Sequence, residues 1–298
     1  MQKAEIMKIL FIINPISGGK EKNDWETTIR QYFKESPHSM EFYLLTGAED
    51  AVSVQHHIQS VNPHRVVGVG GDGTIKMLAE LVQNTAIPLG IIPAGSANGM
   101  ARELEIPVDI DTALDIAVNG VVKPIDVIRV NGEICIHLSD VGLNAMLVKY
   151  FEKSEKRGMW GYGKAVFRVL YEKQKMYATI TLDDNSCKRK AYMVTIANAR
   201  KYGTGANINP EGDVADGYFE VVVVRKLNLL EISKAIFTEK SFHPSRIEVF
   251  KTKKLHLSLL HKAFFQVDGE YRGKIKELTA SIVPNALKIM HPQPKAEQ

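Results

Sequence analysis

Residues 66–82 read VVGVGGDGTIKMLAELV, an apolar run that passes through glycines into an amphipathic stretch. The run has the length of a buried strand, and the apolar positions after Thr74 recur at helical spacing. Gly70, Gly71 and Gly73 let the backbone approach a ligand closely, and a helix start adds unpaired N–H groups and a positive dipole end. The stretch therefore predicts a strand, a phosphate-binding turn and a helix. A tight strand-to-helix turn without a ligand is the plainer alternative.

The same glycines, together with Gly68, match the dinucleotide-binding fingerprint. That fingerprint requires an acidic residue about 20 residues later for the ribose. Residues 81–101 contain no carboxylate, which argues against a nicotinamide enzyme. Ser96 lacks the flanking glycines of a hydrolase elbow, so we interpret its hydroxyl as a hydrogen-bond donor rather than a nucleophile.

Short apolar runs and amphipathic stretches alternate on both sides of this turn. We expect strands at 9–13, 42–45, 65–70 and 89–93, and helices at 25–33, 52–58 and 75–82. This order is typical of an α/β domain with a parallel sheet, which binds ligands at the carboxyl ends of its strands. The glycine-rich and polar turns that begin at Asn14 and Pro93 would share that edge with the first turn.

The second half of the chain has a different sequence pattern, in which most segments are extended and are separated by turn residues. They lie at 125–130, 134–138, 177–182, 192–197, 219–224 and 255–260. This pattern predicts an antiparallel β-sandwich, interrupted by helices at 145–171 and 229–237. We therefore expect a nucleotide-binding α/β domain at 1–124 and a β-sandwich substrate domain at 125–298. The extreme C-terminal segment has room to pack back on the first domain.

Composition, charge and cysteine spacing indicate where the protein works more than which reaction it catalyses. The net charge of +4 over 298 residues is too weak to indicate a nucleic-acid partner. Cys135 and Cys187 lie far apart, which favours a reducing compartment. No apolar run is long enough to span a bilayer, so we expect a cytoplasmic protein without a transmembrane segment. Any contact with a membrane would be peripheral.

Several motifs together resemble the diacylglycerol kinase catalytic domain family, which includes bacterial lipid kinases and sphingosine kinases. The motifs are Asn14-Pro15-x-Ser17-Gly18, Gly70-Gly71-Asp72-Gly73-Thr74, Pro93-x-Gly95-Ser96-x-Asn98, Asp216-Gly217 and Asp268-Gly269-Glu270. The resemblance implies an α/β nucleotide domain followed by a β-sandwich domain. It also implies an ATP-dependent lipid kinase that phosphorylates a diacylglycerol-like or sphingoid-like hydroxyl at the membrane surface.

The resemblance also implies roles for individual residues. The residues implied in ATP binding are Asn14, Pro15, Ile16, Ser17, Gly18, Thr46, Gly70, Gly71, Asp72, Gly73, Thr74, Ile75, Lys76, Ser96 and Asn98. Asp268 would be the catalytic base. Glu270, two residues on, would face the same way in an extended segment, to orient the base or bind metal.

A Mg²⁺ site is implied at Asp213, Asp216 and Tyr218, with a carboxylate from Asp216 and main-chain carbonyls from the other two. Plain turns are the alternative both here and at Asp268-Gly269. The family pattern often has Asn-Glu where this chain has Lys76 and Met77. That departure would place a cation near the phosphates.

Two rival functions stay open. A NAD kinase-like enzyme with a soluble substrate shares the Gly-Gly-Asp-Gly loop, but its pattern has the Asn-Glu pair. A nucleotide-binding or lipid-binding protein with little catalysis is the second rival, and it would keep the phosphate-binding turn without the catalytic activity. Cations and aromatics at 153–168 fit an interfacial anchor, an acceptor lid or a solvated helix, and 201–205 would line the acceptor cleft. The acceptor lipid and the oligomeric state stay open, with a homodimer among the options.

Overall fold

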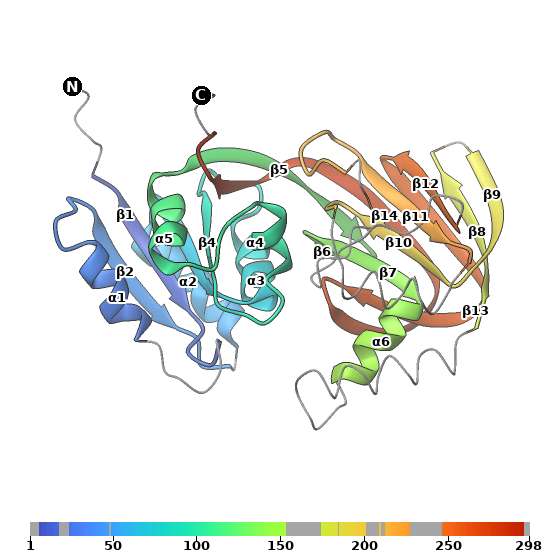
Figure 1. Ribbon diagram of the computed structural model, residues 1–298, viewed down its shortest axis with the longest axis horizontal. Helices are drawn as coiled ribbons and strands as arrows, with labels where there is room; N and C mark the ends of the chain where they lie inside the picture. Colours follow the sequence, from blue (N-terminus) through green and yellow to red (C-terminus); the bar gives the residue numbers. More distant parts are fainter. Residues whose placement is uncertain are drawn as a thin grey trace. The chain divides into compact units, whose positions relative to one another are not determined.

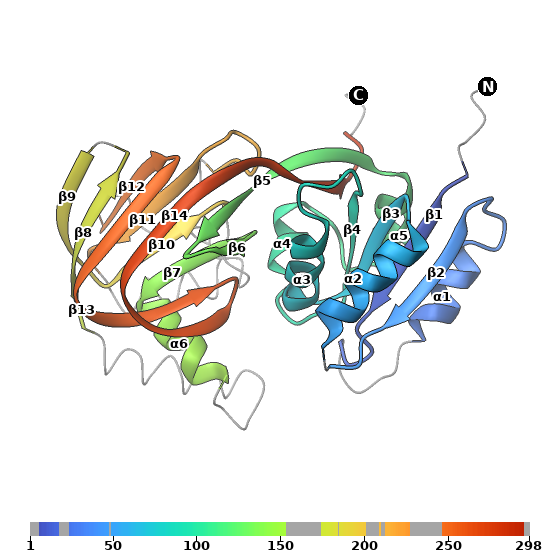
Figure 2. The same cartoon turned by 180° about the vertical axis from the view of Figure 1, so that it is seen from behind.

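The computed structural model describes residues 6–17, 24–47, 49–152, 174–183, 185–200, 209, 212–226 and 246–294. The chain forms two compact units, Met1–Ile125 with Asn285–Gln298, and Asp126–Pro284. It leaves the first unit within β5 (Val121–Val130) and returns within β14 (Glu270–His291), as Figures 1 and 2 show.

The first unit is an α/β domain on a parallel sheet, which confirms the predicted fold class. Its strand order is β2-β1-β3-β4-β14, where only the end of β14 takes part. The strands are β1 (Lys8–Ile13), β2 (Ser39–Leu44), β3 (Arg65–Gly70) and β4 (Leu89–Pro93). The helices are α1 (Trp25–Tyr32), α2 (Asp50–Val61), α3 (Asp72–Val82), α4 (Gly99–Glu103) and α5 (Ile110–Asn119). The sequence patterns did not predict α4 and α5.

Burial explains why these strands have continuous apolar sequences. Every residue of β3 and β4 is buried, as expected for parallel strands that are covered on both faces. The edge strand β2 consists of exposed and half-buried residues only. Gly68 in β3 serves packing, because a Cβ there would lie 2.6 Å from Leu78 of α3. The first glycine of the apparent dinucleotide fingerprint is thus explained by contact between a strand and a helix.

The second unit is a β-sandwich with mostly antiparallel strands, again as predicted. One layer has the order β12-β11-β10-β7-β13, and the other has β9-β8-β13-β14-β5-β6. Its elements are β6 (Glu133–Cys135), β7 (Leu138–Gly142), α6 (Leu143–Glu152), β8 (Met176–Leu182), β9 (Asn185–Ala191), β10 (Met193–Ala197), β11 (Phe219–Val224), β12 (Ile247–Thr252) and β13 (Lys254–Val267).

Strand β13 belongs to both layers of the sandwich. Residues 255–259 pair with β8, and residues 265–267 pair with β7. An irregularity between Ser258 and Ala263 separates these two stretches. The strand thereby carries the chain from one layer to the other and ends at Asp268.

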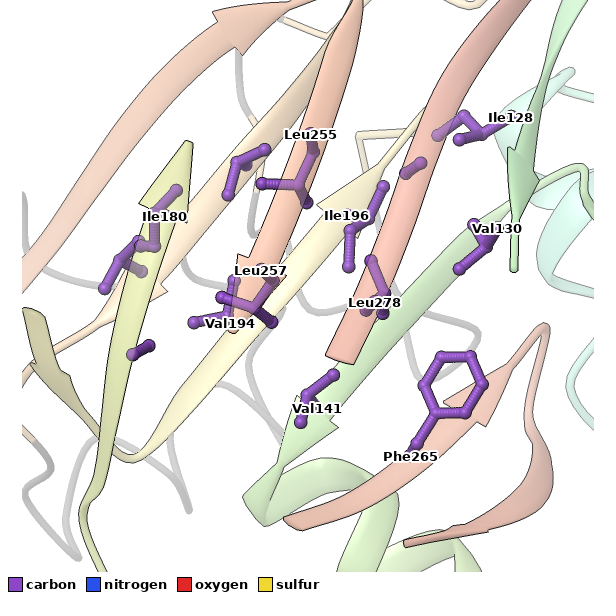
Figure 3. Close-up of a cluster of buried hydrophobic side chains, with 14 of the residues drawn as sticks. Ile128, Val130, Val141, Ile180, Val194, Ile196, Leu255, Leu257, Phe265 and Leu278 are labelled. Atoms are coloured by element: carbon purple, nitrogen blue, oxygen red, sulfur yellow. The ribbon is translucent and has the colours of Figure 1, made fainter. Parts of the chain in front are cut away.

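A shared apolar core holds the two layers together (Figure 3). Val141 and Val194 come from one layer and Ile180 and Leu278 from the other, and each is at most 1% exposed. Each buried side chain of this size stabilises the fold by about 1.5–3 kcal/mol.

Three elements predicted in this unit are not seen in full among the described residues. The strand predicted at 134–138 is interrupted, because β6 ends at Cys135 and β7 begins at Leu138. Of the helix predicted at 145–171, α6 accounts for the part up to Glu152, and the rest lies outside the described residues. The predicted helix at 229–237 and the candidate acceptor segments at 153–168 and 201–205 also lie outside them.

Within the described part of the chain, none of the helices combines the length and apolarity needed to cross a membrane.

Candidate active site

The first candidate site lies at the carboxyl ends of β1 and β3, which are adjacent parallel strands. The order β2-β1-β3-β4 places the topological switch of the sheet between them, where open α/β sheets bind ligands. Asn14 follows β1 directly, and its N–H donates to Val69 O at 2.9 Å. Its side-chain Nδ2 donates to Thr74 Oγ1 at 3.2 Å. The first two predicted loops are therefore joined across the switch point.

The turn at 70–74 leads from β3 directly into α3. Gly71 precedes the helix in an extended conformation, and no described side chain caps this helix end. Ile75 N donates to Gly71 O at 3.1 Å, which is the first bond of the helix. The N–H groups of residues 72–74 therefore have no acceptor within the helix, and the helix dipole adds positive potential there. This end of α3 is suited to an anion such as phosphate.

The loop at 94–98 packs against this turn through a contact between two glycines. A Cβ on Gly95 would lie 2.5 Å from Gly71 Cα, so the close approach requires glycine. Asn98 adopts a left-handed conformation with a φ of 51°. Its Oδ1 accepts from Gly95 N and its Nδ2 donates to Gly95 O, both at 2.8 Å. Ser96 stays exposed at the tip of this fixed loop.

Two predicted ATP-binding residues in α3, Asp72 and Ile75, have structural contacts that the sequence did not reveal, and a third, Lys76, is buried. Asp72 Oδ1 accepts from Met100 N at 3.2 Å and so ties α3 to the start of α4. Ile75 is 2% exposed and its N–H is used within the helix, so it packs in the core. Lys76 is 4% exposed, so most of its side chain is buried.

The remaining predicted ATP-binding residues lie near the ends of β1 and β2. Ser17 N donates to Asn14 O at 3.1 Å, while Pro15 and Ile16 are exposed. Gly18 lies outside the described residues. Thr46 follows β2, where its N–H and hydroxyl both donate to Asp50 Oδ1, at 2.9 and 3.1 Å.

Asp50 holds this turn as a charged acceptor. Burial by itself raises the pKa of Asp50, but the hydrogen bonds from the Thr46 and Gly47 N–H groups outweigh it, so the net pKa is lowered.

The second candidate site is in the other unit, at the turn between β13 and β14. Asp268 has a φ of 49° and Gly269 a φ of 84°, so two consecutive residues are left-handed. The Asp268 carboxylate accepts from three consecutive backbone N–H groups, Ile136 at 3.1 Å, His137 at 2.9 Å and Leu138 at 3.2 Å. These donors interrupt the strand that was predicted at 134–138. They also favour the ionised carboxylate.

A buried polar pair lies beside this turn. Gln266 Nε2 donates to Asp140 Oδ2 at 2.6 Å, and Gln266 Oε1 accepts from Gly269 N at 2.7 Å. Asp140 also accepts from Ala145 N at 2.8 Å and from Asn144 Nδ2 at 2.6 Å, at the start of α6. Burial raises the pKa of Asp140 to about 6, although these hydrogen bonds oppose the shift.

The sequence argument that Glu270 faces the same way as Asp268 assumed an extended segment. The structure does not have one there, because Asp268 and Gly269 form a left-handed turn. The Glu270 carboxylate pairs with Arg272, which also pairs with Glu133 at 2.7 Å. The hydrogen bonds to Glu133 and then Glu270 raise the pKa of Arg272. Glu270 is therefore part of a surface ion-pair network.

The predicted metal-binding residues lie on the loop that precedes β11. Asp213 Oδ1 accepts from Ala215 N and Asp216 Oδ1 accepts from Tyr218 N, both at 3.0 Å. Asp216 Oδ2 also pairs with Lys251 Nζ at 2.6 Å. No cluster of three or more His, Cys, Asp or Glu side chains with metal-binding geometry occurs among the residues that the structure describes.

The donor chemistry of this loop nevertheless suits Mg²⁺, which prefers carboxylate and carbonyl oxygens. A further carboxylate, Asp126 of β5, is 1% exposed and accepts from Gly217 N at 2.6 Å. Lys251 is the group that a cation at Asp216 would have to displace.

Sequence reasoning missed Asp126, Asp140 and Gln266. Each is at most 2% exposed within an apolar strand. A charged or amide side chain inside an apolar run was the available signal, because such groups are rarely buried without partners.

Comparison with known proteins identifies both halves of the chain. Residues 8–130 match the diacylglycerol kinase catalytic domain, and residues 139–291 match the YegS C-terminal NAD kinase beta sandwich-like domain. The chain is 27% identical to a diacylglycerol kinase of Bacillus subtilis (strain 168), covering 96% of this chain and 97% of that protein. It is also 27% identical to a diacylglycerol kinase of Staphylococcus aureus (strain bovine RF122 / ET3-1), covering 89% and 86%.

A solved structure agrees on the fold. The crystal structure of a diacylglycerol kinase from Bacillus anthracis str. Sterne superposes with a TM-score of 0.75 at 19% identity, covering 97% of this chain and 98% of that one. The class of protein that the fold and these matches define is a lipid kinase. The chain carries a domain of the diacylglycerol kinase catalytic domain family at residues 8–130, followed by a domain of the YegS C-terminal NAD kinase beta sandwich-like family at residues 139–291.

Proposed function

We propose that this protein transfers the γ-phosphoryl group of ATP to a hydroxyl of a diacylglycerol-like or sphingoid-like lipid. In this reaction the bond from the γ-phosphorus to the β–γ bridging oxygen breaks, a bond to the acceptor oxygen forms, and ADP leaves. The observation that carries the proposal is the uncapped start of α3 at the switch point between β1 and β3. The family membership supports the lipid acceptor.

The loops around that helix end supply what a triphosphate requires. The N–H groups of residues 72–74 would bind phosphate oxygens, with Asn14 and the exposed Ser96 as side-chain donors. Thr74 is already held by Asn14, and Gly95 by Asn98, so the loops are ordered before a ligand binds. Preorganised donors of this kind lower the cost of binding.

Asp268 would accept the proton of the attacking hydroxyl. Phosphoryl transfer needs accurate positioning and charge stabilisation more than a strong base, so a carboxylate that backbone N–H groups hold ionised suits the role. Glu270 pairs with Arg272, which leaves it a supporting electrostatic role at most.

Mg²⁺ would be held at Asp213, Asp216 and Tyr218, with Asp126 of β5 close by, since its carboxylate accepts from Gly217 N. When bound, the metal would neutralise anionic charge on this loop and order it. We further propose that the enzyme works in the cytoplasm and reaches its lipid by peripheral contact with the membrane.

A NAD kinase-like activity is the second candidate, because the description of the second domain names the NAD kinase sandwich. Radiolabelled ATP with diacylglycerol, sphingosine, NAD or a total lipid extract distinguishes the candidates. We expect label in an organic-phase lipid and none in NADP. Label in NADP alone would favour the NAD kinase-like activity and contradict the lipid kinase proposal. ATP binding without any labelled product would favour a nucleotide-binding or lipid-binding protein with little catalysis.

A further inference from the structure

We propose that Asp140 and Gln266 are positioning residues that set the conformation of the turn carrying Asp268. This inference rests on the proposed role of Asp268 in proton transfer. Neither residue belongs to the site motifs, and neither is adjacent to Asp268 in sequence. They act through the hydrogen bond between Gln266 Oε1 and Gly269 N.

The pair is fixed in place on all sides. Asp140 is 0% exposed and Gln266 is 2% exposed. The two residues lie directly opposite each other on β7 and β13. The backbone of Gln266 is held as well, since its carbonyl accepts from Ser139 Oγ at 2.7 Å. At the other end, the Asp140 carboxylate accepts from the first turn of α6.

The direction of each hydrogen bond gives the pair its function. An ionised carboxylate can only accept, so Asp140 requires the Nε2 end of the Gln266 amide. The Oε1 end must then face Gly269, whose N–H needs an acceptor. With an acceptor-only group at 140, only one of the two amide orientations satisfies both neighbours. Asp140 thereby selects the orientation that supports the turn.

The turn needs this support because it contains backbone strain. Left-handed φ values are costly for residues with a Cβ, and Asp268 has a φ of 49°. Such a conformation persists only where its surroundings determine it. Gly269 N, the next amide along the chain, is fixed by Gln266, while the Asp268 carboxylate is fixed by residues 136–138. The two sets of contacts hold opposite ends of the same short turn.

Two isosteric substitutions test this directly. Asp140→Asn allows the Gln266 amide to turn over, so that an NH₂ group faces Gly269 N–H. Gln266→Glu places a second carboxylate against Asp140. The double variant Asp140→Asn/Gln266→Glu restores the polarity, because the new amide at position 140 can donate to a carboxylate that still accepts from Gly269 N–H. It also restores the original net charge, and Asn144 can rotate its amide to accept from residue 140.

The four proteins should be compared by steady-state kinetics on the lipid acceptor, by thermal unfolding, and by the amide resonance of Gly269. We expect each single variant to lower kcat about tenfold or more, with KM for ATP unchanged, and to shift the Gly269 resonance. We expect the double variant to recover both readouts.

Two results would overturn the inference. One is a folded Asp140→Asn variant with the kcat of wild type. The other is a folded double variant whose kcat and Gly269 resonance are no nearer to wild type than those of the single variants. If the single variants do not fold, the double variant still decides by the same two readouts. Asp268→Asn is measured in parallel. Full activity of that variant would instead remove the proposed role of Asp268.

Discussion

Asp268 Oδ1 accepts a hydrogen bond from His137 N at 2.9 Å, although 131 residues separate the two in sequence. The bond joins the turn between β13 and β14 to the break between β6 and β7. A carboxylate that is held by consecutive backbone N–H groups has a fixed orientation and retains its negative charge. This relationship explains how a half-buried residue in a hairpin turn can have a defined geometry for chemistry.

Replacement of Asp268 by Asn should abolish most of the phosphoryl transfer. The amide cannot accept a proton, and its NH₂ group would face backbone donors. We expect kcat to fall by about 10²–10⁴-fold, with ATP affinity by titration calorimetry unchanged because the predicted nucleotide loops lie in the other unit. Asp183→Asn is a matched control, since Asp183 is also a left-handed turn residue, with a φ of 46°. Near-normal turnover of the Asp268 variant would show that another group is the base.

Asp140 should make the protein less stable as the pH rises, which is the opposite of the usual effect of a carboxylate. Its pKa is raised from 3.8 to about 6 because burial disfavours the charged form. Between these values the native state binds more protons than the unfolded state, so stability falls as pH rises through this window. The shift corresponds to about 3 kcal/mol.

Urea unfolding between pH 4 and pH 7 measures this effect. The Asp140→Asn variant should lose the contribution, so its stability should decline less over the same window. An identical pH dependence in both proteins would show that Asp140 does not titrate as described.

The contact between Gly71 and Gly95 predicts that Gly95→Ala damages the nucleotide loops without touching a ligand-binding group. The added Cβ would meet Gly71 Cα at 2.5 Å, so the backbone must move. We expect a loss of about 1–3 kcal/mol in unfolding free energy and weaker ATP binding. Ser96→Ala is the neighbouring control and should affect ATP affinity alone.

For the same reason, a substitution at Gly71 itself would mix a loss of phosphate binding with a loss of packing. A Cβ at that position would lie 3.1 Å from Gly95 Cα, so part of any loss would be structural. Unchanged stability and ATP affinity in Gly95→Ala would contradict the packing argument.

Lys251 should compete with Mg²⁺ for Asp216, because its Nζ lies 2.6 Å from Asp216 Oδ2. Lys251→Met removes the competing cation, so Mg²⁺ should raise the thermal unfolding temperature more in this variant than in wild type. Lys253→Met is a matched control, since both lysines lie over the Tyr218 ring. Equal responses to Mg²⁺ in the two variants, or a response that survives Asp216→Asn, would argue against a metal at this loop.

The sequence predicted those parts of the fold that depend on local pattern. The strands at 65–70 and 89–93 were predicted with the observed bounds, because strands covered on both faces are continuous apolar runs. A turn at Asp268-Gly269 was the plainer alternative that the sequence offered, and the structure has a turn there. The helix expected from Ile75 begins at Asp72, because Gly71 provides the extended residue that precedes it. Helix α5 was missed, since its β-branched residues have weak helix propensity and packing on β4 compensates.

The relationships that define the two sites could not be predicted, because they depend on tertiary contacts. Nothing local pairs Asn14 with Thr74, or Asp268 with the amides of 136–138. The passage of β13 between two layers depends on its register with β7 and β8. The Lys251 contact to Asp216 likewise crosses 35 residues of sequence.

A crystal structure with a non-hydrolysable ATP analogue would show whether the start of α3 binds the phosphates of ATP. We expect phosphate oxygens within hydrogen-bond distance of the N–H groups of residues 72–74, beside Asn14. A triphosphate bound at another place on the protein, with this helix end covered by side chains, would contradict it.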